Sequence, residues 1–142
     1  NRKNRNDFIY KRDSNEKKLI KYALKNKIPT FCICRGFQLM NISLGGQVTK
    51  NLVREIQNQQ EVIIVDKNKR RKVILVNSFH HHAVKVNQLS KHLLAKGLSS
   101  SGDYVEYFAH EKLPIIGIQW HPERKMKSKK FNDDLFSKFL KM

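Results

Sequence analysis

Two parts of the sequence carry residues that could do covalent chemistry, and the first is built around Cys34. An apolar run from Ile28 to Ile33 leads to this cysteine, Gly36 follows it, and a helical pattern begins at once. This order is typical of a buried strand that turns sharply into a helix and holds a nucleophile at the corner. A helix N-terminus lowers the pKa of a thiol, and the backbone N–H of Arg35 could help to hold an oxyanion. We therefore predict that Cys34 is a nucleophile.

The second part is His121-Pro122-Glu123, which closes an apolar run near the C-terminus. In an extended segment, residues i and i+2 project to the same side, so the Glu123 carboxylate could hold the His121 ring in one tautomer. The other ring nitrogen is then available to a thiol, and Cys, His and Glu form a complete set of nucleophile, base and orienting group. Spacing alone does not bring Cys34 and His121 together, so at this point the set is a hypothesis.

Two other features contain residue types that could be reactive or bind a metal, and we assign neither of them to a functional site. Cys32 is assigned to the core, because most buried cysteines serve packing. The run His80-His81-His82 invites a metal site, but neighbours in an extended segment point in alternating directions. No cysteine or carboxylate cluster at zinc spacing lies nearby. We expect no metal and no cofactor.

Length and charge narrow the class of protein. The chain has 142 residues, which indicates a single domain, and 29 Lys and Arg residues against 12 Asp and Glu residues give a net charge of +17. Such a charge can mark a nucleic-acid-binding protein, but no zinc-finger spacing, RNP-like aromatic motif or helix-turn-helix pattern accompanies it. We do not expect nucleic acid as the partner. No apolar stretch is long enough to cross a membrane and no secretory signal is visible, so we expect a cytoplasmic protein.

The pattern of apolar residues predicts alternating helices and strands. We expect a loop over 1–12, a helix over 14–26 with an N-cap at Asp13 and a capping-box partner at Glu16, and a buried strand over 30–33. After the Cys34 turn, an apolar helix should run to Gly45-Gly46. Further along we expect a loop over 47–60 with a strand at 47–49, a hairpin of strands 61–66 and 72–76, a short helix within 86–94, strands 104–110 and 115–120, and a helix over 132–141.

Three motifs, in order, resemble those of a known family. They are Cys34-Arg35-Gly36-x-Gln38-x-x-Asn41 followed by Gly45-Gly46, Val76-Asn77-Ser78-Phe79-His80-His81-x-Ala83-Val84, and Gly117-Ile118-Gln119-Trp120-His121-Pro122-Glu123. The first resembles the nucleophile elbow of the class I glutamine amidotransferases, closest to their γ-glutamyl hydrolase branch (peptidase C26). The second resembles the middle motif of γ-glutamyl-γ-aminobutyrate hydrolase and its relatives. The third resembles the motif with the catalytic histidine and glutamate.

The resemblance implies an α/β fold, a flavodoxin-like open sheet with helices on both faces, and a mechanism. Cys34 would attack the γ-carbonyl of a γ-glutamyl amide, with His121 as base and Glu123 as its orienting group. The γ-glutamyl thioester would then be hydrolysed, releasing glutamate and an amine. By resemblance, Gln38 lies in the substrate pocket, Ser78 and His80 form its other wall, and Arg35 provides an oxyanion N–H from its backbone. The partner would be a small γ-glutamyl substrate, and a homo-oligomer stays open.

Two departures from the family pattern leave alternatives open. Cys32 stands where the family usually has glycine, and its side chain could crowd the elbow. Family domains are also longer, and their first strands, with a Gly-Gly loop that completes the oxyanion hole, precede the helix expected at 14–26. We therefore expect residues 1–142 to form a single, partial, N-terminally truncated domain. The alternatives to a free-standing hydrolase are a glutaminase subunit that passes ammonia to a synthetase, or a catalytically impaired binding module.

Overall fold

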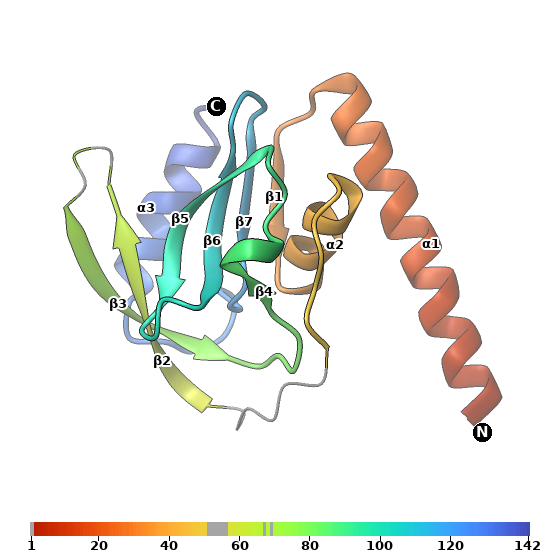
Figure 1. Cartoon of the computed structure of the whole chain (residues 1–142), viewed down its shortest axis with the longest axis horizontal. Coiled ribbons are helices and arrows are strands. Elements are labelled where there is room, and N and C mark those ends of the chain that lie inside the picture. The colour runs from red at the N-terminus through yellow and green to blue at the C-terminus, as the bar shows by residue number, and fades with distance from the viewer. Residues whose placement is uncertain (1, 51–56, 67, 69) are drawn as a thin grey trace.

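The computed structural model describes residues 2–50, 57–66, 68 and 70–142. Within these ranges a helix–strand–helix unit comes first, a run of strands follows it, and α3 follows the last of these strands (Figure 1). The elements in chain order are α1 (Arg2–Asn26), β1 (Thr30–Ile33), α2 (Arg35–Ser43), β2 (Gln57–Val65), β3 (Arg71–Ser78), β4 (Val84–Lys85), the 3-10 turn η1 (Val86–Gln88), β5 (Leu93–Ser99), β6 (Tyr104–His110), β7 (Ile115–Ile118) and α3 (Lys129–Phe139).

One mixed sheet organises these elements. Its strands lie in the order β1-β7-β6-β5-β2-β3, and the short β4 pairs with β6. Only β1 and β7 pair in parallel among the strands that the structure describes, with Ile33 opposite Ile118. Because the two strands run the same way and end level, the residues that follow them emerge at the same edge of the sheet. Cys34 follows β1 directly, and the segment that carries His121 follows β7.

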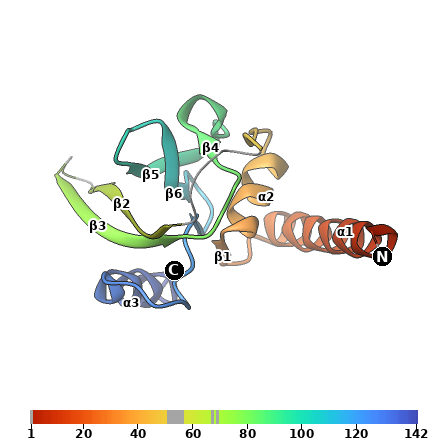
Figure 2. The ribbon, with the colours of Figure 1, turned by 90° about the horizontal axis from the view of Figure 1, so that it is seen from below.

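Helices cover both faces of the sheet, as predicted. On one face α1 and α2 pack on the sheet through Ile20, Phe37, Leu39 and Met40, which meet Val105, Phe108 and Ile115. On the other face Leu135 of α3 packs with Val62, Val76, Ile116 and Trp120. Figure 2 shows α3 separated from α1 and α2 by the curved sheet. Burial of these two apolar layers is the main stabilising term of the fold.

The N-terminal helix differs from the sequence prediction. Residues 2–12, expected as a loop, belong to α1, and Asp13 therefore lies inside the helix instead of capping it. The segment contains neither Gly nor Pro, so nothing in it interrupts a helix. Asp13 and Glu16 are three residues apart on one helical face, and both pair with Arg35 of α2. None of the described helices is long and apolar enough to span a membrane.

The middle of the chain contains the other corrections. The loop expected over 47–60 gives way at Gln57 to β2, and the strand expected at 47–49 is a single bridge between Thr49 and Ala83. Residues 51–56 of that prediction lie outside the described part. The helix expected within 86–94 is only the turn η1, and β5 follows it. A mixed Leu, Ala, Lys and Gly composition hides β5, because its pairing with β2 and β6 sets its conformation.

The remaining elements follow the predictions with small shifts at their ends. β1 and β6 have the expected bounds, and α2 ends just before Gly45, which has a φ of 89°. The hairpin strands β2 and β3 are longer than expected, although residues 67 and 69 of the turn between them lie outside the description. β7 stops at Ile118, two residues early. α3 begins at Lys129, three residues early, so Asp133 and Asp134 lie within it and not at its N-terminus.

Candidate active site

Cys34 stands at a strained corner between β1 and α2. Its φ of 48° and ψ of −100° lie outside the regions that side-chain-bearing residues normally occupy. The corner is fixed on both sides, because the backbone N–H of Cys34 donates to the Ile118 carbonyl at 2.9 Å and its own carbonyl accepts from Gln38 at 3.2 Å. Such a conformation costs about 1–3 kcal/mol and persists only where the surroundings impose it. The strained elbow is therefore held by the β1–β7 pairing.

The Cys34 thiol is half-buried and touches a side chain that the sequence analysis gave no role. Nε2 of Gln119 donates to Sγ of Cys34 at 3.7 Å. Burial raises the pKa of the Cys34 thiol, and the nearby Glu123 carboxylate raises it further. A hydrogen bond from the backbone of Arg35, the bond from Gln119 and the charge of Arg124 all lower the pKa, but the net direction is upward. A thiolate at Cys34 thus depends on these donors and on a base.

Cys32 fills a place in the core and leaves the elbow free. Its side chain is 5% exposed, and burial raises the pKa of its thiol to about 12. A Cβ atom built on Gly36 would lie 3.8 Å from the Cβ of Cys32, which is an ordinary contact. The cysteine that stands in place of the family's usual glycine is therefore accommodated without crowding.

His121 and Glu123 form a hydrogen-bonded pair at the same edge of the sheet. Nδ1 of His121 lies 2.6 Å from Oε1 of Glu123. The side chain of His121 is 19% exposed and that of Glu123 is 57% exposed. Partial burial opposes ionisation of Glu123, but hydrogen bonds from its own backbone and from His121 outweigh it and lower the pKa of the carboxyl group. An ionised Glu123 places a proton on Nδ1 and leaves Nε2 of His121 as an acceptor.

No hydrogen bond joins Cys34 to His121 within the described part of the chain. The two residues follow paired strands, and the Glu123 carboxylate is close enough to raise the pKa of the Cys34 thiol. The structure therefore places the three predicted catalytic residues in one neighbourhood and pairs two of them. Catalytic hydrogen bonds in ligand-free enzymes are often long and shorten when substrate binds.

The backbone of His121 is clamped by Asn77, at the end of β3. Nδ2 of Asn77 donates to the His121 carbonyl at 2.8 Å, and Oδ1 accepts the His121 N–H at 2.9 Å. Asn77 is fully buried. Because an amide side chain offers one donor and one acceptor in a fixed plane, these two bonds define the position of the His121 peptide. The clamp links β3 to the segment that carries the base.

Gln38 belongs to a network that reaches the nucleophile. Its Nε2 donates to the His82 carbonyl at 3.1 Å and to Oε1 of Gln119 at 3.3 Å. Gln119 is fully buried, and its Nε2 is the group that donates to Cys34. Gln38 thus orients the Gln119 amide so that its donor, and not its oxygen, faces the sulfur.

Ser78 and His80, which the resemblance assigns to the pocket wall, are buried. Ser78 is 3% exposed and His80 is 5% exposed. Nδ1 of His80 donates to the His82 carbonyl at 2.9 Å, and its Nε2 lies 3.4 Å from Oγ of Ser78 and 3.8 Å from Oε2 of Glu106. The ring therefore contacts protein groups through both nitrogens, and its role toward substrate stays a prediction.

The Arg35 side chain points away from the nucleophile. Its guanidinium pairs with Asp13 and with Glu16, the latter at 2.9 Å from Nε. These two carboxylates belong to α1, so Arg35 ties α1 to the first turn of α2. Its predicted contribution to the site is through its backbone N–H, which hydrogen-bonds the Cys34 thiol and lowers its pKa.

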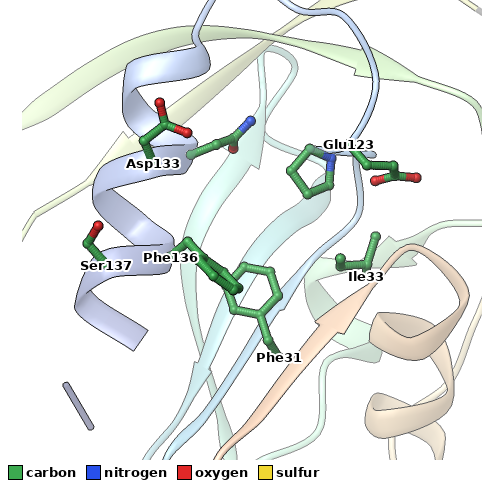
Figure 3. A pocket seen from close by; sticks show the side chains of 8 residues that line it. Phe31, Ile33, Glu123, Asp133, Phe136 and Ser137 are labelled. Atoms are coloured by element: carbon green, nitrogen blue, oxygen red, sulfur yellow. The ribbon is translucent and has the colours of Figure 1, made fainter. Parts of the chain in front are cut away.

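A cavity of about 380 Å³ lies beside the site, between β1 and α3. Phe31 and Ile33 of β1 and Phe136 and Ser137 of α3 are among the residues that line it. Figure 3 shows Phe31 beside Phe136, with Ile33 and Glu123 lying farther from α3. Neither Cys34 nor His121 lines this cavity. The cavity therefore adjoins the outer side of Glu123 and does not enclose the nucleophile.

Nothing in the described ranges is arranged as a metal centre. Within them, no three His, Cys, Asp or Glu side chains converge so that they could hold an ion. The three neighbouring histidines differ in their surroundings: His80 is buried, His81 is exposed and His82 is half-buried.

Three residues with evident importance escaped the sequence analysis. Gln119 and Asn77 are part of the quoted motifs, but their contacts join segments that are far apart in the chain. Glu106 had a local signal, because it is a carboxylate within the otherwise apolar strand Tyr104–His110. A carboxylate that is flanked on both sides by buried residues of its strand needs a polar partner in the interior. His80 is such a partner, with its Nε2 atom 3.8 Å from Oε2 of Glu106.

Known proteins resemble this chain in sequence. The sequence model of the family Peptidase C26 matches residues 1–123. Protein NtpR of Enterococcus hirae is 32% identical over an alignment of 148 positions, which covers 91% of this chain and 61% of that protein. Gamma-glutamyl-CDP-amidate hydrolase of Campylobacter jejuni is 32% identical over 114 residues, covering 80% of this chain and 52% of that protein. The chain thus spans half to three fifths of the length of these relatives.

The fold is also that of solved amidotransferases. A glutamine amidotransferase from Thermotoga maritima superposes with a TM-score of 0.65 at 24% identity, over 78% of this chain and 47% of that one. This likeness confirms the flavodoxin-like open sheet that the motifs imply. Fold and motifs together define a class I glutamine amidotransferase-like protein. Within that class, the chain belongs to the Peptidase C26 family.

Proposed function

We propose that this protein hydrolyses γ-glutamyl amides through a γ-glutamyl thioester on Cys34. The observation that carries the proposal is the strained Cys34 elbow, held by β7 next to the His121–Glu123 pair. A nucleophile on a strained turn beside an oriented imidazole is the arrangement that acyl transfer needs. The name of the Campylobacter jejuni relative supports an amide of glutamate as the substrate.

In the first half-reaction the thiol of Cys34 gives its proton to Nε2 of His121, and the thiolate attacks the γ-carbonyl carbon. The C–N bond then breaks, and the protonated His121 returns the proton to the leaving amine. Glu123 holds the proton on Nδ1 throughout and stabilises the imidazolium, because its carboxyl group stays ionised. The product of this step is a γ-glutamyl thioester and a free amine.

In the second half-reaction water attacks the thioester carbon while His121 takes its proton. The C–S bond breaks, the sulfur leaves as the thiolate and regains a proton, and glutamate is released. The backbone N–H of Arg35 stabilises the oxyanion of both tetrahedral intermediates, and Gln119 stabilises the thiolate by its hydrogen bond to Sγ. Asn77 keeps the His121 peptide in place in both steps.

Gln38, Ser78 and His80 complete the proposed pocket. Gln38 is half-buried, and its amide donates to Gln119, whose own amide contacts Sγ of Cys34, which supports a place for Gln38 in the substrate pocket. His80 is buried and supports the His82 carbonyl that Gln38 contacts, and the buried Ser78 contacts the other nitrogen of the His80 ring. The substrate is a small molecule in this proposal.

The test is the release of p-nitroaniline from γ-glutamyl-p-nitroanilide, followed by its absorbance, beside the variant Cys34→Ala. The wild-type chain should turn over and the variant should not. Labelling of Cys34, and not Cys32, by the glutamine analogue diazo-oxonorleucine should be seen by peptide mass spectrometry. Absence of both turnover and labelling in the folded chain would refute the proposal. Glutamine hydrolysis that begins only when a second protein is added would favour a glutaminase subunit instead.

A further inference from the structure

Two arginines stand next to the proposed catalytic residues, and their surroundings differ. Arg35 follows Cys34, but its guanidinium is already neutralised by Asp13 and Glu16. Arg124 follows Glu123 and is exposed, and no carboxylate of the described residues lies within ion-pair distance of its guanidinium. Of the two, only Arg124 has a charge that can be offered to an anionic ligand.

The Arg124 side chain is held in place by an aromatic ring. Its guanidinium carbon lies 4.3 Å from the centre of the Phe79 ring. Phe79 in turn meets the His121 ring edge-on, with 6.2 Å between the ring centres. A cation stacked on an aromatic face keeps its hydrogen-bond donors at its edges free, because the attraction acts through the flat side of the guanidinium. Phe79 therefore serves as a platform that fixes Arg124 beside the imidazole.

The backbone fixes the same place. The N–H of Arg124 donates to the His121 carbonyl at 3.1 Å in a tight turn, and that carbonyl also accepts from Asn77. Arg124 is thus tied to the clamped His121 peptide at one end and to the Phe79 ring at the other. Its charge also reaches the Cys34 thiol, whose pKa it lowers.

We propose that the Arg124 guanidinium, stacked on Phe79, is the subsite that receives the α-carboxylate of the γ-glutamyl substrate. In a γ-glutamyl group four bonds separate the γ-carbonyl carbon from the carboxylate carbon, roughly 5 Å in an extended chain. With its γ-carbonyl at Cys34, the substrate would extend its carboxylate toward the one neighbouring arginine that has no acidic partner among the described residues. The inference rests on the proposed function and names the group that selects glutamyl over other acyl chains.

The experiment measures binding and does not require turnover. In the Cys34→Ala chain, calorimetry compares γ-glutamyl-p-nitroanilide with 4-aminobutanoyl-p-nitroanilide, which lacks only the α-carboxylate. Adding Arg124→Gln should weaken binding of the γ-glutamyl ligand by about 10- to 100-fold, the range for a hydrogen bond to a charged group. It should leave binding of the 4-aminobutanoyl ligand almost unchanged. Lys125→Gln, which removes an exposed charge one residue away, should leave both affinities unchanged.

The same pair of ligands separates this inference from the proposed function. If the wild-type chain hydrolyses neither ligand but Arg124→Gln removes the preference for the carboxylate, the hydrolase proposal fails and the subsite stands. If the wild-type chain turns over γ-glutamyl-p-nitroanilide and Arg124→Gln changes both ligands equally or neither, the subsite is refuted and the hydrolase stands. Failure of the Cys34→Ala chain to bind either ligand also refutes the subsite.

Discussion

Two of the histidine–glutamate pairs in the described part of the chain, His121–Glu123 and His80–Glu106, differ in almost everything except residue type. In the His121–Glu123 pair the atoms are 2.6 Å apart and the carboxylate side chain is 57% exposed. In the His80–Glu106 pair they are 3.8 Å apart, and the side chains are 2% and 0% exposed. His121 keeps one ring nitrogen for a substrate or a thiol, whereas both nitrogens of His80 face protein groups.

The difference shows that burial decides what such a pair can do. A base must exchange protons with a substrate, and a ring enclosed by protein atoms has no route for this exchange. A buried carboxylate and imidazole instead fix the elements that carry them, because separating them would leave a charged or polar group without solvent. The first pair is therefore a candidate for chemistry, and the second joins β6 to the segment after β3.

The largest effect should come from removing the base. His121→Gln should lower kcat/KM for γ-glutamyl-p-nitroanilide by about 10²–10⁴, the usual contribution of general acid–base catalysis. The melting temperature should change little, because the His121 side chain is partly exposed and its partner Glu123 is 57% exposed. The matched control is His81→Gln, an exposed histidine in the same histidine run, which should retain full activity. Equal loss in both variants would contradict the assignment of His121 as the base.

Disruption of the buried His80–Glu106 pair should lower the stability of the fold. Glu106→Ala should lower the free energy of unfolding by about 3–5 kcal/mol, because it leaves His80 in the interior without its carboxylate partner. Urea denaturation followed by circular dichroism measures the change. Glu111→Ala is the control, since it breaks an exposed contact with His92 and should leave stability nearly unchanged. Similar denaturation midpoints for the two variants would contradict the assignment of Glu106 as a structural anchor.

Asn77 tests whether the exposed pair depends on its support. Asn77→Ala removes both hydrogen bonds to the His121 peptide, and a small displacement of a catalytic group can cost about 10²-fold in rate. The loss should appear in kcat, with KM changing less, because the clamp acts on the base and not on substrate. Asn87→Ala, at an exposed asparagine in η1, is the control. A loss confined to KM would assign Asn77 to substrate binding instead.

The smallest effect concerns the pKa of the nucleophile. The Glu123 carboxylate raises the pKa of the Cys34 thiol, so Glu123→Gln should lower that pKa and move the midpoint of alkylation by iodoacetamide to lower pH. Turnover should fall at the same time, since His121 loses its orienting carboxylate. Cys32 does not interfere, because its pKa of about 12 keeps it protonated. A midpoint that moves to higher pH would show that Glu123 acts on Cys34 in another way.

Proline and glycine residues near the elbow made its position predictable from the sequence. Elements whose conformation depends on pairing with distant strands were harder to predict. Pro29, Gly36 and the pair Gly45-Gly46 mark the ends of β1 and α2 within a few residues of where the structure has them. β5 was missed because neither its composition nor its alternation marks a strand, and its register includes shifts around Gly97. A side chain on Gly97 would come within 2.8 Å of Ile64, so its glycine is explained only by the neighbouring strand.

The candidate site shows the same division. The residue types at Cys34, His121 and Glu123 indicate a nucleophile, a base and an orienting carboxylate, and the three motifs occur along the chain in the family's order. The contacts of Gln119 with Cys34 and of Asn77 with His121 join residues 85 and 44 positions apart, so no local pattern could reveal them. The burial of His80 was hidden for the same reason, since its partner Glu106 lies on a different strand.

The position of β7 between β1 and β6 has a consequence for the order of events during synthesis. Cys34 leaves the ribosome long before its neighbour Gln119, which comes 85 residues later. At 5–20 residues per second this interval is roughly 4–17 s. Until β7 arrives, β1 lacks its partner strand among the described residues, and the hydrogen bond from Cys34 to Ile118 that fixes the elbow cannot form. The Cys34 elbow is thus absent from the nascent chain at first and forms only after most of the sheet has been synthesised.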